Sequence, residues 1–425
     1  MAQGRFPDRS TWLIAYTLAV TLLCVFVFTG NGLIDTVAFL ALLVPLFIAS
    51  DFDKTDPRVG RLVLAFVLLC ALPVIGMRNT FYLDVAIQVG IFAVLALGLN
   101  IVVGFAGLLD LGFIAFFAVG AYLWAILSSP HGAALLGSGF PLQGDAFFVI
   151  AIVAVFVAAG AGALLGLPVL RLKGDYLAIV TLGFGEVIRV LANNLDKPVN
   201  ITNGPQGVAG IAQPLTEAAR ALATATTAPA FKWQALIYYA VVLALVLVAV
   251  LANRRLDSSS IGRSWVAIRE DEIAAQAMGV PLVRTKLIAF ATGAAFAGTM
   301  GVLFAAKQTF VSPESFDFNQ SIGILAMIVL GGLGSIRGVM MGAGLVTILN
   351  LQVLKSLSAG LNHLRATGFE IFGWSFANLP TQFEPSKYER LIFGLILIAM
   401  MLYRPRGLVP AERRPISARD ARRAS

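Results

Sequence analysis

Charged side chains are scarce in this sequence. Only 13% of its 425 residues are Asp, Glu, Lys or Arg, while 58% are hydrophobic, and soluble proteins carry about 25% charged residues. A water-soluble core of this size cannot enclose so many apolar side chains, so lipid must solvate much of the chain. The composition therefore predicts an all-α polytopic membrane protein.

Cysteine and histidine are almost missing as well. Cys24 and Cys70 both lie in apolar runs and behave as small hydrophobic residues, because no CxxC pair or disulfide framework is available. His131 and His363 fall in expected outer loops, and the sequence has no HExxH motif or histidine cluster. We therefore expect no metal site.

Enzyme motifs are also lacking. The sequence contains no GxxxxGK[ST] and no GxSxG, so the chain does not bind ATP through a P-loop of its own. Pairs of buried carboxylates, which an ion-coupled carrier would usually have, are not seen either. An intramembrane enzyme is therefore poorly supported, and we expect no directly bound cofactor.

The charge that is present has an uneven distribution. The net charge is +8 and the isoelectric point is near 9.7. Lys and Arg cluster at the ends of apolar runs and in the tail, as the positive-inside rule predicts for a membrane protein, so nucleic acid is not an expected partner. Both termini are expected inside, marked by Arg5 and Arg9 at one end and by a basic tail at the other, with Arg404, Arg406, Arg413, Arg414, Arg419, Arg422 and Arg423.

Apolar runs predict about ten to twelve transmembrane helices, with one or two Gly-rich segments as candidates for re-entrant structure. The runs cover residues 11–29, 33–50, 62–76, 81–103, 106–128, 146–170, 174–192, 233–252, 287–306, 321–333, 345–354 and 388–403. The connections at 193–232, 307–319 and 355–387 are expected to be outer loops.

Three regions follow from this pattern. Residues 1–80 form a hydrophobic extension of about three spans, expected to be a peripheral scaffold. Residues 81–408 form a Gly-rich core, and residues 409–425 form the basic tail. In the core Gly334, Gly338 and Gly342 recur every fourth residue, which favours a tight helix crossing.

Several polar residues lie inside the predicted spans, where each needs a physical reason. Asp110 is either a carboxylate at a helix start, favoured by the helix dipole, or a gate residue on a transport path. Glu186 and Arg189 are three residues apart on one helix face and are expected to pair with each other or with a neighbouring helix, the alternative being that they line a vestibule of the path. Asn100 and Thr181 are expected to hydrogen-bond between helices, although both remain candidates for the path.

Residues 258–286 are the one substantial charged stretch between two long apolar runs. Ile261, Trp265 and Ile268 share one helical face, and the preceding serines are candidate caps. Asp271 is expected to cap a second helix over 272–278, which Gly279 ends in the left-handed conformation. Such a helix pair is either a docking element for a cytoplasmic partner or a solvated linker.

Several long stretches make the sequence similar to a known family. They are LGLNIVVGFAGLLDLGFIAFFAVGAYL (97–123), LPVLRLKGDYLAIVTLGFGEVIRVL (167–191), IGRSWVAIREDEIAAQAMGV (261–280) and LFAAKQTFVSPESFDF (303–318), with VLGGLGS (329–335) and YRPRGL (403–408). In these stretches the chain resembles the LivM family, the permease subunits of branched-chain amino-acid ABC importers. The first eighty residues and the stretch 355–386 lie outside this likeness.

The resemblance implies that residues 254–286 are an EAA-type coupling loop. Glu272, Ala274, Ala275 and Gly279 take the places of that motif's glutamate, alanines and glycine, although Ile273 separates Glu272 from the alanines. The implied ATPase-coupling residues are Arg269, Asp271, Glu272, Ala274, Ala275 and Gly279.

The resemblance also implies the partners and the place of the protein. It implies a second permease (LivH-like), two ATPase subunits (LivG-like and LivF-like) that use the ATP, and a periplasmic amino-acid-binding protein. It further implies a multi-pass protein of a bacterial inner membrane. The alternatives are an ion-coupled secondary carrier, a permease for another amino acid or amide, and a membrane enzyme or scaffold.

Overall fold

The structure is a computed structural model, and it describes residues 9–27, 32–49, 57–137, 139–169, 174–226, 229–367, 370–371, 374–375 and 385–411. Long apolar segments form helices here because a helix satisfies all of its backbone hydrogen bonds internally, as lipid requires. The predicted basic marker Arg5 and the tail from Arg413 onward lie outside the described residues.

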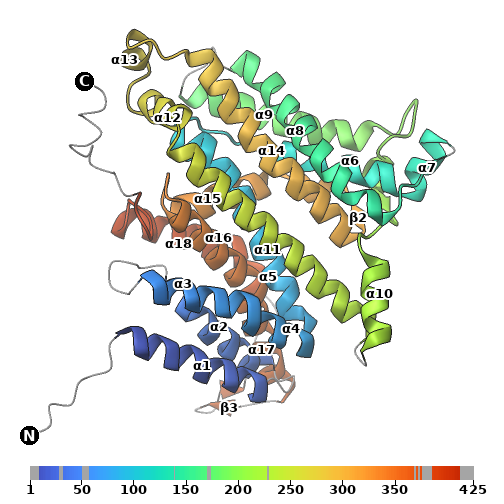
Figure 1. Ribbon diagram of the computed structural model, residues 1–425, viewed down its shortest axis with the longest axis vertical. Helices are drawn as coiled ribbons and strands as arrows, with labels where there is room; N and C mark the ends of the chain where they lie inside the picture. Colours follow the sequence, from blue (N-terminus) through green and yellow to red (C-terminus); the bar gives the residue numbers. More distant parts are fainter. Residues whose placement is uncertain are drawn as a thin grey trace, which may run out of the picture. The chain divides into compact units, whose positions relative to one another are not determined.

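The α-helices of the described residues are, in chain order, α1 (Arg9–Val27), α2 (Gly32–Ala49), α3 (Pro57–Phe66), α4 (Leu72–Arg78), α5 (Thr80–Asn100), α6 (Ile114–Ser128), α7 (Pro130–Leu136), α8 (Phe147–Val169), α9 (Asp175–Asn194), α10 (Thr216–Ala225), α11 (Ala230–Asp257), α12 (Ser260–Glu270), α13 (Glu272–Ala277), α14 (Leu282–Gln308), α15 (Phe318–Gly331), α16 (Ile336–Ile348), α17 (Lys355–Ala366) and α18 (Glu389–Tyr403) (Figure 1).

Shorter elements complete the described chain. Three π-helical turns are η1 (Val67–Ala71), η2 (Ile101–Phe105) and η6 (Leu349–Leu354), and the 3-10 turns are η3 (Gly144–Ala146), η4 (Gly204–Gln206), η5 (Pro313–Phe316) and η9 (Pro385–Tyr388). Two antiparallel strand pairs join β1 (Val208–Ala209) to β2 (Phe310–Val311) and β3 (Glu370–Ile371) to β4 (Trp374–Ser375).

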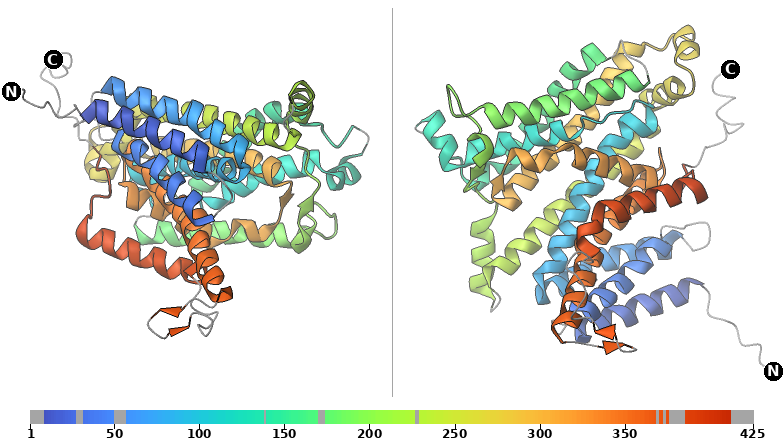
Figure 2. Two further views of the ribbon diagram at one scale, coloured as in Figure 1. Left: turned by 90° about the horizontal axis from the view of Figure 1, so that it is seen from below. Right: turned by 180° about the vertical axis from the view of Figure 1, so that it is seen from behind.

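The chain forms two compact units, and the first comprises Met1–Phe92, Gln213–Val246 and Gly344–Ile396. Its helices α1, α2 and α3 lie side by side (Figures 1 and 2). A buried polar contact fastens α2 to the α16–α17 helix, since Gln352 Nε2 donates to Thr36 Oγ1 at 2.8 Å and Thr36 Oγ1 lies 2.8 Å from Ser356 Oγ. The N-terminal helices are thus tied to the following chain by specific hydrogen bonds.

The second unit comprises Ala93–Ala212, Leu247–Ala343 and Leu397–Ser425. At its centre α14 packs along both α6 and α8 (Figure 1). Glycine makes this close approach feasible, because a Cβ on Gly120 would lie 2.0 Å from the carbonyl oxygen of Gly298, and one on Gly298 would lie 2.3 Å from Cβ of Ala158. The predicted Gly-rich packing is confirmed in this unit.

Two expected boundaries are wrong. The span expected at 106–128 is helical only from Ile114, because α5 ends through the π-turn η2 and residues 107–112 form no helix. The outer loop expected from residue 355 begins with a helix instead, since α16, η6 and α17 run on without a break. Loss of hydropathy was mistaken for loss of helix there, because Lys355 and Ser356 are polar helical residues.

The membrane class is confirmed. Among the described residues seven helices are long and apolar enough to span a bilayer. Shorter apolar helices cover Leu13–Cys24, Asp35–Val44, Ile114–Ser128 and Leu391–Tyr403. This is a multi-pass, all-α membrane protein.

Candidate functional site

The charged stretch after α11 folds into the two short helices that the sequence predicts. Ser259 Oγ accepts from the Gly262 amide at 3.1 Å and starts α12, whereas Asp271 Oδ1 accepts from the amides of Ile273 and Ala274 at 2.9 and 3.0 Å and starts α13. Gly279 has φ of +86°, the left-handed conformation that favours glycine. Local capping rules therefore suffice to build this α12–α13 pair.

Helix α12 is anchored to the start of α14 by its apolar face. Trp265 is fully buried, Ile268 is buried beside it, and the indole Nε1 donates to the Thr285 carbonyl at 2.8 Å. The predicted shared face of Ile261, Trp265 and Ile268 is thus the face that packs. Because of this anchor α12 cannot shift without pulling on α14.

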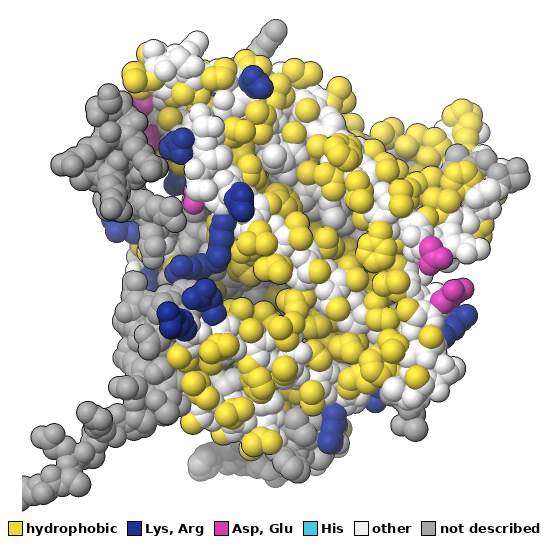
Figure 3. Space-filling view, viewed as in Figure 1, with side chains coloured by type: hydrophobic (Ala, Val, Ile, Leu, Met, Phe, Trp, Pro, Cys, Tyr) yellow, Lys and Arg dark blue, Asp and Glu magenta, His cyan; other side chains and the backbone are white. Residues whose placement is uncertain are grey.

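Helix α13 presents an exposed apolar surface in polar surroundings. Ile273 is 73% exposed and Met278 is 85% exposed, with Ala274 exposed between them. Ala275, by contrast, is buried against the protein. On the face shown in Figure 3, hydrophobic side chains cover most of the surface, and most of the Lys and Arg side chains lie on its left side. A small exposed apolar surface bordered by charged residues is typical of a protein-docking element.

Glu272 turns inward and holds α13 in place. Its Oε1 lies 2.8 Å from Nζ of Lys286, whose side chain is only 4% exposed. Glu272 is therefore a structural partner of α14 within this chain. Sequence reasoning missed the pair because the two residues are fourteen positions apart, and no local spacing joins them.

Arg269 lies apart from the exposed apolar surface of α13. Its Nη1 donates to the carbonyl oxygen of Gly104, at the end of the α5–η2 helix. Among the predicted coupling residues, Ala274 and Arg269 are both exposed, but Arg269 also bonds to the Gly104 carbonyl, whereas Glu272 pairs with Lys286 and Ala275 is buried.

Asn100 and the glycines after α15 come together as tightly packed turns. The Gly334 amide donates to Asn100 Oδ1 at 2.9 Å, which confirms the expected hydrogen bond from Asn100 to another segment. A Cβ on Gly338 would lie 2.3 Å from the Gly331 carbonyl, and one on Gly342 would lie 2.1 Å from the Met327 carbonyl. The tight α15–α16 crossing is confirmed, although Gly334 itself lies in the turn.

Asp110 lies in the non-helical stretch before α6. Its Oδ1 accepts from the Gly112 amide at 2.9 Å, and the side chain is fully buried. Thr181 Oγ1 accepts from the Leu111 amide at 3.0 Å, and Ser321 Oγ accepts from the Ile114 amide at 3.2 Å. These hydroxyls of α9 and α15 satisfy amides that the start of a helix leaves unpaired. Asp110 thus stands near a helix start, as one of its two interpretations expects.

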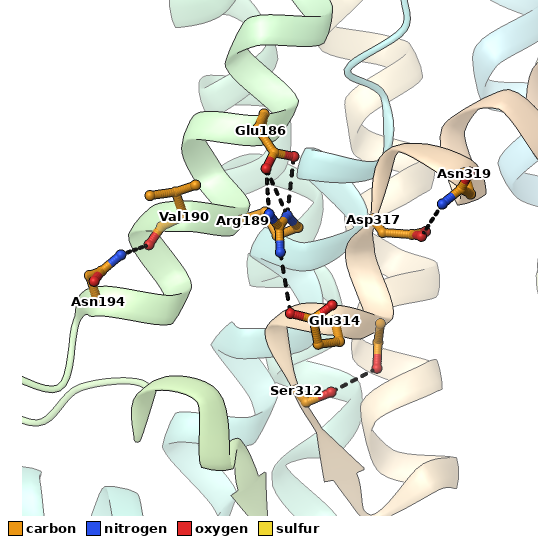
Figure 4. Close-up of polar contacts among 9 residues, drawn as sticks. Glu186, Arg189, Val190, Asn194, Ser312, Glu314, Asp317 and Asn319 are labelled. Atoms are coloured by element: carbon orange, nitrogen blue, oxygen red, sulfur yellow. Dashed lines mark hydrogen bonds and ion pairs between the residues drawn. The ribbon is translucent and has the colours of Figure 1, made fainter.

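Glu186 and Arg189 form the predicted pair on α9 (Figure 4). Arg189 Nε donates to Glu186 Oε1 at 3.0 Å, and its Nη1 lies 3.3 Å from Oε1 of Glu314 in η5. The third member was not predicted, because Glu314 is 125 positions from Arg189 in the sequence. This cluster lies near the far end of α14 from the α12–α13 pair.

The described residues hold no group of three or more His, Cys, Asp or Glu that would suit a metal ion. They form apolar helices, and two of these, α5–η2 and α15, end inside the protein where small and polar residues such as Asn100 and Gly334 meet. Broken helices at buried polar positions are typical of solute permeases.

Comparison with known proteins specifies this class. The family described as the permease component of branched-chain amino acid transport systems matches residues 81–401. The high-affinity branched-chain amino acid transport system permease protein LivM of Escherichia coli (strain K12) is 39% identical over 385 residues, covering 87% of this chain and 79% of the relative. LivM of Salmonella typhimurium is 37% identical over 410 residues, covering 91% and 85%. No solved structure matches the chain significantly.

The chain belongs to this family of permease components. The resemblance seen in the sequence is thereby confirmed.

Proposed function

We propose that this chain is a membrane-spanning subunit of an ATP-driven importer of branched-chain amino acids. Family membership and the names of the relatives support the substrate class. The subunit itself performs no catalysis, since its sequence has no P-loop, and hydrolysis would fall to two separate ATPase subunits. A second, homologous permease and a periplasmic binding protein complete the proposed assembly.

The observation that carries the proposal is the exposed apolar surface of α13. Ile273, Ala274 and Met278 are exposed to solvent. The ion pair between Glu272 and Lys286 fixes α13 to the start of α14. A short helix entering a groove on another protein is a recurring recognition mode. An ATPase subunit is the partner that an ATP-driven permease without a nucleotide site requires.

The same loop supplies a path for movement. Helix α11 leads into α12, and α14 begins directly after α13, so both long helices are covalently joined to the docking element. A displacement of α13 by the closing ATPase pair would be transmitted by these helices as rigid bodies. In this arrangement α12 and α13 lie in the cytoplasm of a bacterial cell, both termini are also cytoplasmic, and the Glu186–Arg189–Glu314 cluster faces the binding protein.

A sharp test uses an exposed side chain of α13. Bulk at Ala275 or Gly279 is expected to uncouple transport, but one is buried and the other left-handed, so either change also alters the loop itself. Ala274→Trp changes only the exposed surface. We expect this variant to insert normally, to lose co-purifying ATPase subunits and to lose leucine uptake. The matched control is Gly160→Trp on α8, where a Cβ meets nothing within 4 Å. Wild-type leucine uptake by the Ala274→Trp complex would contradict the proposal.

One observation favours an ion-coupled carrier as the second candidate. Asp110 Oδ2 is buried and has no hydrogen-bond partner among the described residues, and an intramembrane carboxylate is a functional-site hypothesis by default. Uptake into vesicles separates the two functions. An importer requires ATP and its ATPase subunits, whereas a carrier transports on a proton gradient with this chain alone.

A further inference from the structure

Four segments that are distant in sequence come together around Arg269. They are the last turn of the α5–η2 helix, α12 itself, the turn between α15 and α16, and the chain after α18. Arg269 lies at their centre, with Nη1 on the Gly104 carbonyl and 3.3 Å from where a Cβ on Gly334 would stand. All of these residues belong to the second compact unit.

The Gly104 carbonyl needs a partner because the helix ends there. After η2 the amides of Ala106 and Leu108 bond to Ile101 and Val102, so neither reaches Gly104. The last carbonyls of a helix are otherwise unpaired and carry its negative dipole end, which a guanidinium group complements. Arg269 is thus chemically matched to this helix end.

The close approach of Arg269 to the end of α5–η2 depends on glycines, which have no side chain. A Cβ on Gly107, which has φ of +70°, would lie 2.8 Å from Cγ of Arg269. One on Gly104 would lie 2.0 Å from Oδ1 of Asn100 and 2.7 Å from the Gly334 amide nitrogen. The aliphatic stem of Arg269 therefore rests on bare backbone, and its head reaches the helix end.

The contact extends to the α15–α16 turn. Asn100, one turn before Gly104, accepts from the Gly334 amide at 2.9 Å. On the other side of this turn, the amides of Leu408 and Val409 donate to Leu330 and Gly331 at 2.9 and 3.0 Å. The α15–α16 turn is thus held between the end of α5–η2 and the chain after α18. A displacement of α5–η2 would therefore also displace this turn.

We propose that Arg269 is a positioning residue that transmits displacement of α12 to the broken ends of two core helices, α5–η2 and α15. This route is non-covalent and parallel to the covalent one through α11 and α14. It rests on the proposed function, because it needs α12–α13 to be moved by a partner. It assigns the head group of Arg269, a residue that is itself exposed on α12, a role distinct from docking.

Three substitutions and a control on the same helix test the route. Arg269→Met keeps the stem over Gly107 but has no donor, whereas Arg269→Gln and Arg269→Lys each keep one. The control is Arg263→Met, since Arg263 is exposed on α12 and, among the described residues, donates only to the nearby Ser258 carbonyl at 3.2 Å.

The first measurement is hydrogen exchange of the purified full chain in lipid nanodiscs, which needs no partner. We expect Arg269→Met to speed exchange in residues 101–113 and 331–336, and Arg263→Met to leave both unchanged. Unchanged exchange in Arg269→Met would overturn the contact. Because this measurement also reports the folded remainder of the chain, a misfolded variant would be recognised. Arg269→Gln, whose donor lies two bonds nearer the backbone than Nη1, would then take its place against Arg269→Lys.

The second measurement is leucine transported per ATP hydrolysed by the reconstituted complex. We expect Arg269→Met to retain its ATPase subunits but to lower this ratio by about fivefold or more, the lower range of measured coupling effects. Arg269→Lys should recover most of it. A wild-type ratio in Arg269→Met would overturn the transmission role. Failure of the wild-type complex to transport with ATP would instead overturn the proposed function itself.

Discussion

The two ends of α14 are built in different ways. A helix of its length extends about 40 Å, so its ends lie on opposite sides of a bilayer core about 30 Å thick. At the Leu282 end, buried contacts hold α12 and α13: Trp265 on the Thr285 carbonyl and Glu272 on Lys286. At the Gln308 end, the ion pair of Arg189 and Glu314 joins α9 to η5 with a carboxylate side chain that is 70% exposed.

The two ends thus differ in how deeply their polar contacts are buried. Buried, hydrogen-bonded contacts are costly to break because the remaining partner is left unsatisfied. Exposed ion pairs contribute little and exchange readily with water and salt. We therefore expect the contacts at the end carrying α12 and α13 to contribute more to stability than those at the opposite end.

The largest effect is expected from Trp265→Ala. Removing a fully buried Trp side chain leaves a cavity between α12 and α14 and should lower the free energy of unfolding by about 3–5 kcal/mol. Denaturant unfolding in detergent measures this change. Trp265→Phe keeps most of the apolar volume and should cost about 1 kcal/mol for the lost hydrogen bond. Equal losses in the two variants would show that packing does not hold α12.

A smaller loss is expected from Glu272→Gln. The substitution leaves the buried Lys286 ammonium without its carboxylate and should cost about 3 kcal/mol. The same unfolding measurement applies. Replacing both partners, by Glu272→Leu with Lys286→Met, should restore much of the loss, because no charge is then buried unpaired. If the double variant unfolds more easily than Glu272→Gln, the cost does not come from leaving a buried charge unpaired.

The smallest effect is expected from Glu314→Gln at the opposite end. Its ion pair with Arg189 is exposed, so the loss should stay below about 1 kcal/mol. The difference from wild type should shrink further at high salt, which screens exposed charges. Unfolding at low and high salt measures both. A loss as large as that of Glu272→Gln would remove the contrast between the two ends.

Contacts between near neighbours in the sequence were predictable, and distant ones were not. The Asp271 cap, the left-handed Gly279 and the Glu186–Arg189 pair all follow from spacings of a few residues. Arg269 was expected to couple to an ATPase, and its contact with Gly104, 165 positions away, was not predicted. No periodicity connects residues at such a distance.

Helix boundaries show the same limit. The break at residues 107–112 lies within an apolar run, so hydropathy continues across it while the helix does not. The amides of Leu111 and Gly112 bond to Thr181 and Asp110 instead of helical carbonyls, and the first amide of α6 bonds to Ser321. Both hydroxyls come from other helices. The break therefore depends on groups that only the folded bundle brings together.

The sequence by itself determined the membrane class and the family, because apolar composition and long ordered motifs need no folding to be recognised. It also determined the two short helices after α11, since caps act over a single turn. The tertiary structure alone decided which residues of that stretch face outward and which face the core. Ala274 and Arg269 lie five positions apart in one charged loop and both are exposed, but only the folded bundle brings the Gly104 carbonyl at the end of α5–η2 within reach of Arg269.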